Sequence, residues 1–103
     1  MDQVSHQRLR LENLSKKKWK FVWLKPAEKQ LNKLDLHQQK LIRDYTAKIA
    51  ELDDPFVFAV EMNGDWSGCW RFRVGKYRLI CEPVEEFLLI EVVRVGKRDR
   101  VYD

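Results

Sequence analysis

The chain has 103 residues, of which 45% are hydrophobic and 35% are charged, with a formal net charge of +4. This length fits one domain whose modest core needs no metal or disulfide, and it excludes a multidomain enzyme. No segment approaches the roughly 20 apolar residues of a membrane span, and the polar N-terminus lacks a signal-peptide core. We therefore expect a cytoplasmic protein with no membrane partner.

Residues 1–18 are polar and basic, and their few Leu and Val residues do not recur at helical spacing. We expect a mobile or helical N-terminal extension here, and a folded domain over residues 19–103. The lysines at 16–18, with Lys20, are most simply a solvated charge cluster. The alternative is that they add phosphate contacts to a partner surface.

Alternation over residues 19–24 predicts a short strand with Phe21 and Trp23 on one face. Pro26 fits the first turn of a helix. Asp35 offers an N-cap for a second helix from about Leu36 to Leu52. Helical spacing assigns to its buried face Leu41, Ile42, Tyr45, Ile49 and Leu52, and to its solvent face Gln38, Arg43, Lys48 and Glu51.

Residues 56–68 are expected to be a connection with some packed side chains, among them Trp66. Three strands should follow, namely Cys69–Val74, Tyr77–Glu82 and Phe87–Val95. The order β-α-α-β-β-β predicts a small single α+β domain in which a helical hairpin packs on an antiparallel-rich four-stranded sheet.

The two cysteines, Cys69 and Cys81, fall in predicted strands and form no spaced ligand set with His6 or His37. The simplest interpretation is a pair of buried free thiols. We expect neither a metal site nor a cofactor.

Gly75 and Lys76 separate two alternating segments, which predicts a two-residue hairpin turn. That turn would set Arg73 opposite Arg78. The expected core face carries Trp70, Phe72, Val74, Tyr77, Leu79 and Cys81, and the other face carries Arg71, Arg73, Arg78 and Ile80.

Like charges directly opposite one another destabilise a sheet. A phosphate-bearing partner that neutralises the arginines would explain the pattern. Alternatively, the arginines pair with glutamates nearby: Glu82, Glu85, Glu86 or Glu91. Positive charge continues at the chain end with Arg94, Lys97, Arg98 and Arg100, and Gly96 is expected to break the last strand. Tyr102 would pack on the sheet edge, stack on a nucleobase or place its phenol beside a phosphate.

The segment Gly-Cys-Trp-Arg-Phe-Arg-Val-Gly-Lys-Tyr-Arg-Leu-Ile at 68–80, followed by Val-Gly-Lys-Arg-Asp-Arg-Val-Tyr at 95–102, resembles toxins of the RelE/ParE superfamily, on the RelE side. The resemblance covers residues 19–103. It implies a bacterial type II toxin that cuts mRNA in the ribosomal A site and is held inactive by a cognate antitoxin.

Carried onto this sequence, the resemblance assigns catalytic roles to Arg71, Arg73, Arg78, Arg98 and Tyr102. Positions expected to add RNA contacts are Lys76, Arg94, Lys97 and Arg100. Some family members have lysines where this chain has Arg71 and Arg73, and some continue into a C-terminal helix that is absent here. The first difference bears on the general base, and the second on how Tyr102 is held.

The implied reaction is attack of a ribose 2′-hydroxyl on the adjacent phosphate, leaving a 2′,3′-cyclic phosphate without a metal. Arg78 and Arg98 suit charge stabilisation. Arginine stays protonated, so Tyr102 is the candidate base. The alternatives are catalysis by orientation and electrostatics alone, or one of three carboxylates: Glu61, Glu82 or Glu91.

Three other functions stay open on the sequence. They are a ParE-like toxin that inhibits DNA gyrase, a noncatalytic nucleic-acid-binding module, and an interaction protein whose basic face serves only an acidic partner. For the nuclease, the expected partners are a small acidic antitoxin, mRNA and the 70S ribosome, with operator DNA reached through the antitoxin.

Overall fold

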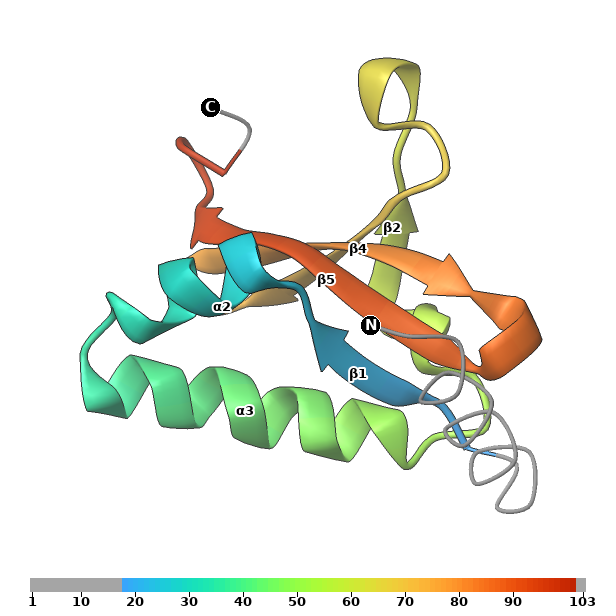
Figure 1. Ribbon diagram of the computed structural model, residues 1–103, viewed down its shortest axis with the longest axis horizontal. Coiled ribbons are helices and arrows are strands. Elements are labelled where there is room, and N and C mark those ends of the chain that lie inside the picture. Colours follow the sequence, from blue (N-terminus) through green and yellow to red (C-terminus); the bar gives the residue numbers. More distant parts are fainter. Residues whose placement is uncertain (1–17, 102–103) are drawn as a thin grey trace.

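The computed structural model describes residues 18–101, in which two helices cover one face of a five-stranded sheet (Figure 1). The main elements are β1 (Lys20–Trp23), α2 (Lys25–Asn32), α3 (Leu36–Ala50), β2 (Ala59–Glu61), β3 (Trp70–Val74), β4 (Tyr77–Val84) and β5 (Leu89–Lys97). Three short 3-10 helices connect them: η1 (Pro55–Phe58), η2 (Gly64–Trp66) and η3 (Glu85–Phe87). The expected extension at residues 1–18 lies outside the described residues except for Lys18.

The strand order is β1-β5-β4-β3-β2, with β1 parallel to β5 and every other pair antiparallel. The expected α+β class and helical hairpin are confirmed. The expected number of strands is wrong, because Ala59–Glu61 pairs with β3 and adds a fifth. This strand has only three residues and follows the exposed, non-alternating Val57 and Phe58, so it carries no clear period-two signal.

The two helices begin where their capping residues indicate. Pro26 lies in the first turn of α2, and an Asp35 carboxylate oxygen accepts a hydrogen bond of 2.9 Å from the Gln38 N–H at the start of α3. The predicted buried face of α3 was too wide. Leu41 is 47% exposed because it lies about a quarter-turn from Ile42, and Leu52 is 36% exposed because it follows the helix end.

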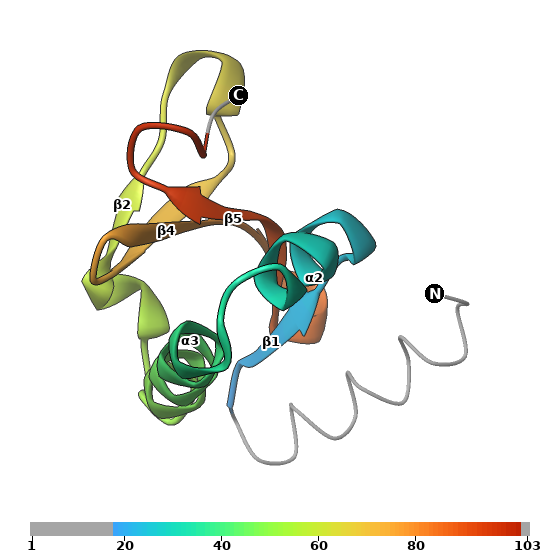
Figure 2. The same ribbon diagram turned by 90° about the vertical axis from the view of Figure 1, so that its left-hand side faces the viewer.

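The core lies between the helices and the sheet (Figure 2). Its buried members come from both layers and include Ala27, Leu31, Ile42, Ile49, Phe72, Leu79, Cys81, Val92 and Val95. Phe56 of η1 closes one end, because its ring contacts those of Trp19, Trp70 and Phe72. Both cysteines are free thiols, but only Cys81 is buried; Cys69 directly precedes β3 and is partly exposed.

The central strands β4 and β5 contain one irregularity. Ile80 lies opposite Arg94 and Cys81 lies opposite Val92, so Val93 is an extra residue in β5. Such a bulge bends its strand and increases the local twist. Beyond it, β5 continues through Gly96 to Lys97, so the expected strand break at Gly96 is wrong.

Neither helix of this part of the chain has the length and apolar character needed to cross a membrane.

Candidate functional site

The β3–β4 hairpin has the register that its turn predicts. Val74 lies opposite Tyr77, Arg73 opposite Arg78, and Arg71 opposite Ile80. Gly75 has a φ of 58°, a left-handed conformation that glycine adopts without steric cost. The two-residue turn therefore determines which side chains share each face of the sheet.

Four arginines gather on the sheet face opposite the helices, and we call Arg71, Arg73, Arg78 and Arg94 the basic face. One cross-strand row runs from Arg71 through Ile80 to Arg94, and the next runs from Arg73 through Arg78 to Gly96. Directly paired residues have Cβ atoms about 4.5–5.5 Å apart. The backbone pairing thus places the side chains of Arg73 and Arg78 at directly neighbouring positions on this face.

Ile80 lies in the middle of the basic face yet has no exposed surface. Its cross-strand neighbours Arg71 and Arg94 are half-buried. Long basic side chains commonly lay their methylene groups over apolar surface while keeping the charged end in water. Ile80 therefore forms a buried apolar site between Arg71 and Arg94. Packing of the arginine methylene groups over Ile80 would favour this arrangement even without a bound partner.

Arg94 connects two segments that are distant in sequence. Its guanidinium carbon lies 5.1 Å from the ring centroid of Trp66, in the β2–β3 arm (residues 62–69). The same guanidinium donates a 3.3 Å hydrogen bond to the carbonyl of Val101 in the C-terminal turn (residues 97–101). Figure 1 shows the arm and this turn rising from the side of the sheet that the helices do not cover.

The C-terminal turn is anchored to the hairpin and to β5. The Arg98 N–H donates to the carbonyl of Lys76 at 3.2 Å, which brings the turn beside Gly75 and Lys76. Val101 is buried, and a Cβ added to Gly96 would come within 3.2 Å of its Cα. Gly96 therefore provides the space in which the turn folds back over the strand.

The sequence profile of the family described as "ParE toxin of type II toxin-antitoxin system, parDE" matches residues 21–102. The chain belongs to this toxin family. It is accordingly a type II toxin of the RelE/ParE superfamily, as its arginine motifs indicate. No curated protein matches the toxin's sequence.

Solved structures share the toxin's fold at low sequence identity. A chain of the RelBE2 toxin–antitoxin complex from Mycobacterium tuberculosis superimposes with a TM-score of 0.71 at 18% identity, covering 79% of the toxin and 99% of that chain. The intact RelBE complex of E. coli gives 0.63 at 18%, with 80% and 99% covered. The archaeal RelE–RelB complex from Pyrococcus horikoshii gives 0.64 at 19%, with 81% and 98% covered.

The structure brings some of the expected site residues of the toxin together and leaves others apart. Arg71, Arg73, Arg78 and Arg94 share the basic face, and Arg98 joins its hairpin end through Lys76. Lys97, Arg98 and Arg100 are exposed in the C-terminal turn. Tyr102 lies outside the described residues, directly after the anchored Val101.

Sequence reasoning missed how the toxin arranges its acidic side chains. Glu82 lies directly opposite Glu91, in the row next to Ile80 and on the same face as the arginines. Positive and negative side chains therefore occupy separate parts of this face, with the glutamate pair lying beyond Ile80 from the hairpin turn. Glu61, another proposed base, lies on β2 opposite Trp70. A β4–β5 register would have revealed the acidic pair, but the bulge at Val93 hid it.

The thiols of the toxin are not activated nucleophiles. Burial raises the pKa of Cys81 well above its usual range, and Cys69 adds to the shift. Burial also raises the pKa of Cys69, with a further contribution from the charge of Glu82. Across residues 18–101, no three His, Cys, Asp or Glu side chains lie close enough together to hold a metal ion.

Proposed function

We propose that this toxin is an endoribonuclease that cuts mRNA, with its basic face holding the RNA backbone in the ribosomal A site. The observation that carries the proposal is the direct pairing of Arg73 with Arg78, flanked by Arg71 on the same strand. Like charges directly opposite one another destabilise a sheet. Guanidinium groups bind phosphate oxygens in a bidentate manner, so an RNA backbone would offset that cost.

The proposed reaction is an internal displacement at phosphorus. The ribose 2′-hydroxyl loses its proton to a base, and its oxygen bonds to the adjacent phosphorus. The bond from phosphorus to the 5′-oxygen of the next nucleotide breaks, and that oxygen takes up a proton. The products are a 2′,3′-cyclic phosphate and a 5′-hydroxyl, with no oxidation or reduction.

Arg78 and Arg98 are proposed to stabilise the charge that develops on the phosphate. Arg98 begins the C-terminal turn that hydrogen-bonds to Lys76, two residues before Arg78. The hairpin and the turn thus place the two residues at one end of the basic face. Loss of one such donor typically lowers a rate by about 10²–10³. Arg71 and Arg73 would hold the flanking phosphates, with Lys76, Arg94, Lys97 and Arg100 adding contacts.

Tyr102 is the proposed base. An ordinary phenol has a pKa of about 10, and surrounding cations favour its ionised form. Val101, the residue before Tyr102, is held over β5 by the hydrogen bond from Arg94 and by the space that Gly96 leaves. If Tyr102 is dispensable, the reaction rests on orientation and electrostatics, with the ribosome holding the mRNA in line.

A second candidate is inhibition of DNA gyrase by binding, which the match to a ParE family profile favours. That function would need no phosphate-binding arginines in a close row. For either function we propose a small acidic cognate antitoxin as partner, because the similar solved structures are complexes of RelE with RelB. Operator DNA would be reached through the antitoxin, and the site of action would be the cytoplasm.

The test is cell-free translation of a defined mRNA with the purified toxin, followed by mapping of new 5′ ends. We expect cuts within ribosome-bound codons and a fall of about 10²–10³ in cutting rate for Arg78→Gln and Arg98→Gln. Lys29→Gln on α2, on the helix side, is the matched control for lost charge and should cut normally.

Gyrase–DNA breaks with intact mRNA would overturn the nuclease proposal and establish the second candidate. Uncut mRNA that is nevertheless bound in a salt-sensitive manner would indicate a noncatalytic nucleic-acid-binding module.

A further inference from the structure

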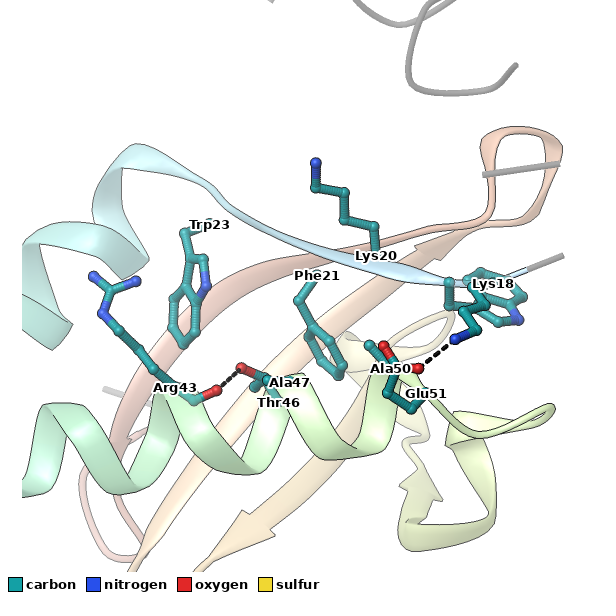
Figure 3. A pocket seen from close by; sticks show the side chains of 10 residues that line it. Lys18, Lys20, Phe21, Trp23, Arg43, Thr46, Ala47, Ala50 and Glu51 are labelled. Atoms are coloured by element: carbon teal, nitrogen blue, oxygen red, sulfur yellow. Dashed lines mark hydrogen bonds and ion pairs between the residues drawn. The ribbon is translucent and has the colours of Figure 1, made fainter. Parts of the chain in front are cut away.

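Helix α3 lines cavities on two of its sides. On one side, a groove of about 410 Å³ lies between β1 and α3, where Phe21 and Trp23 point toward the helix (Figure 3). We call this the edge groove. On another side, a cavity of about 510 Å³ lies between α3 and the end of the β3–β4 hairpin. We call it the hairpin pocket; five residues of α3 line it together with Val74 and Gly75.

Helical spacing explains why one side of α3 faces the hairpin pocket. Leu41, Tyr45 and Lys48 recur at i, i+4 and i+7, and Asp44 lies three residues after Leu41. The opposite wall comes from the hairpin. Tyr45 and Val74 both pack against the hydrophobic core, so the core fixes the two walls relative to each other.

Part of the hairpin pocket is apolar. The side chain of Leu41 is 47% exposed, although leucine is normally buried. Tyr45 and Val74 are half-buried beside it. Water in the pocket therefore contacts apolar surface, and a bound apolar group would displace that water with a favourable free energy.

Opposite charges border the apolar part of the pocket. Asp44 and Lys48 lie four residues apart and both line it, but within residues 18–101 they do not form an ion pair with each other. Burial raises the pKa of Tyr45, with a further contribution from Cys81. The phenol therefore stays protonated at neutral pH and can donate a hydrogen bond. The pocket offers an anion, a cation and a neutral donor beside apolar side chains.

We propose that the hairpin pocket binds a free α-amino acid with a large apolar side chain, such as leucine. The carboxylate of the ligand would meet Lys48 and the Tyr45 hydroxyl, and its ammonium group would meet Asp44. Its side chain would contact Leu41 and Val74. A zwitterion matches both charges of the pocket, whereas an anion would leave Asp44 unmatched. The volume lies within the range of about 300–1,000 Å³ that is usual for small-molecule sites.

The hairpin pocket adjoins the anchor of the C-terminal turn. Gly75 lines the pocket, and the carbonyl of the next residue, Lys76, accepts the hydrogen bond from the Arg98 N–H. A ligand beside Gly75 would therefore restrict the turn to which Arg98 is attached. Consecutive strand residues face opposite sides of a sheet, so a ligand on Val74 leaves Arg73 uncovered. The ligand would act on the C-terminal turn without blocking the basic face.

The test uses the full toxin, isotope-labelled for NMR and titrated with leucine. We expect saturable shifts of the amide signals of Leu41, Tyr45 and Gly75 with a Kd of about 1 mM, together with a shift at Arg98. Glycine has both charges but no apolar side chain, and N-acetyl-leucine amide has the side chain but neither charge. Each should bind at least about fivefold more weakly than leucine.

Substitutions at exposed positions test the charges without disturbing the core. Lys48→Gln and Asp44→Asn should each weaken leucine binding about two- to fivefold, because each leaves one end of the zwitterion unmatched. Arg43→Gln removes a charge from another side of α3, at the edge groove, and is the matched control for Lys48→Gln. This variant should bind leucine normally.

Several outcomes would overturn the amino-acid site. These are an absence of saturable shifts, binding of glycine or N-acetyl-leucine amide as tight as that of leucine, or unchanged binding in both Lys48→Gln and Asp44→Asn. Concentration-dependent shifts at Leu41 without ligand would assign the pocket to a second copy of the chain. Binding without a shift at Arg98 would refute the link to the C-terminal turn. Because no RNA is present, a toxin that binds leucine but leaves mRNA intact refutes only the nuclease proposal.

Discussion

The guanidinium carbon of Arg94 lies 5.1 Å from the ring centroid of Trp66, and this contact joins β5 to the arm between β2 and β3. Because the same guanidinium donates to the carbonyl of Val101, one side chain braces both segments that flank the basic face. The sequence suggested an RNA contact for Arg94. Its geometry adds a positioning role, since Val101 directly precedes the proposed base.

A double-mutant cycle measures the free energy of the contact between Arg94 and Trp66. We expect Trp66→Ala and Arg94→Gln to show a coupling free energy of about 0.5–2 kcal/mol in urea unfolding, because a partly desolvated cation–π contact is lost by either change. The pair formed by Arg43 and Trp23 at 5.7 Å is the control. Arg43 is exposed, so its coupling with Trp23→Ala should be smaller. Additive effects of the Trp66 and Arg94 changes would refute the brace.

Gly96→Ala should displace the C-terminal turn. The added Cβ would lie 3.2 Å from the Cα of Val101, a backbone atom that cannot rotate away. Overpacking of this kind typically costs about 1–3 kcal/mol. We expect a lower melting temperature and, because Arg98 shifts with the turn, a cutting rate reduced by at least about tenfold. A normal rate in a destabilised variant would show that the turn does not position catalytic groups.

Arg73→Glu should separate stability from activity. The new carboxylate would face Arg78 directly, replacing a repulsive pair with an attractive one, and we expect a gain of about 0.2–1 kcal/mol in the free energy of unfolding. RNA cleavage should fall sharply. Added salt should stabilise the wild-type toxin more than the variant, since it screens repulsion in one and attraction in the other. A variant that is less stable at every salt concentration would contradict this account.

Alkaline pH should weaken the fold through Cys81. Its pKa is raised by burial in the folded state, so its stabilising contribution is complete below the unfolded thiol's pKa of about 8.5. That contribution is lost as the pH rises from there toward the folded pKa, at up to about 1.4 kcal/mol per pH unit. Urea unfolding under reducing conditions from pH 8 to 10.5 should show a shallower fall for Cys81→Ala. Cys69→Ala, at a position that water reaches, should change the slope less.

Much of the sheet follows from local signals in the sequence. Gly75 sits where a left-handed turn is required, and the strict alternation on either side leaves one register for the hairpin, so the pairing of Arg73 with Arg78 could be predicted. Asp35 marks the start of α3 for an equally local reason, because its side chain satisfies a free N–H of the first turn.

The remainder depends on contacts that are distant in sequence. β2 exists because β3 offers it a partner, and its three residues carry too little periodicity to reveal it. The bulge at Val93 and the continuation of β5 through Gly96 depend on how β4 and Val101 pack against β5. The edge groove needs β1 and α3 to be placed side by side, which no local pattern specifies.

Of the strands in residues 18–101, β5 comes last in sequence but lies inside the sheet. Its residues 89–92 are bonded to residues 20–23 of β1, and its other edge is bonded to β4. During translation, β1 has no partner in the sheet until residues 89–92 have left the ribosome. A product that stops before residue 89 lacks the strand that joins the two halves of the sheet. The two halves of this sheet therefore join only once β5 has been made.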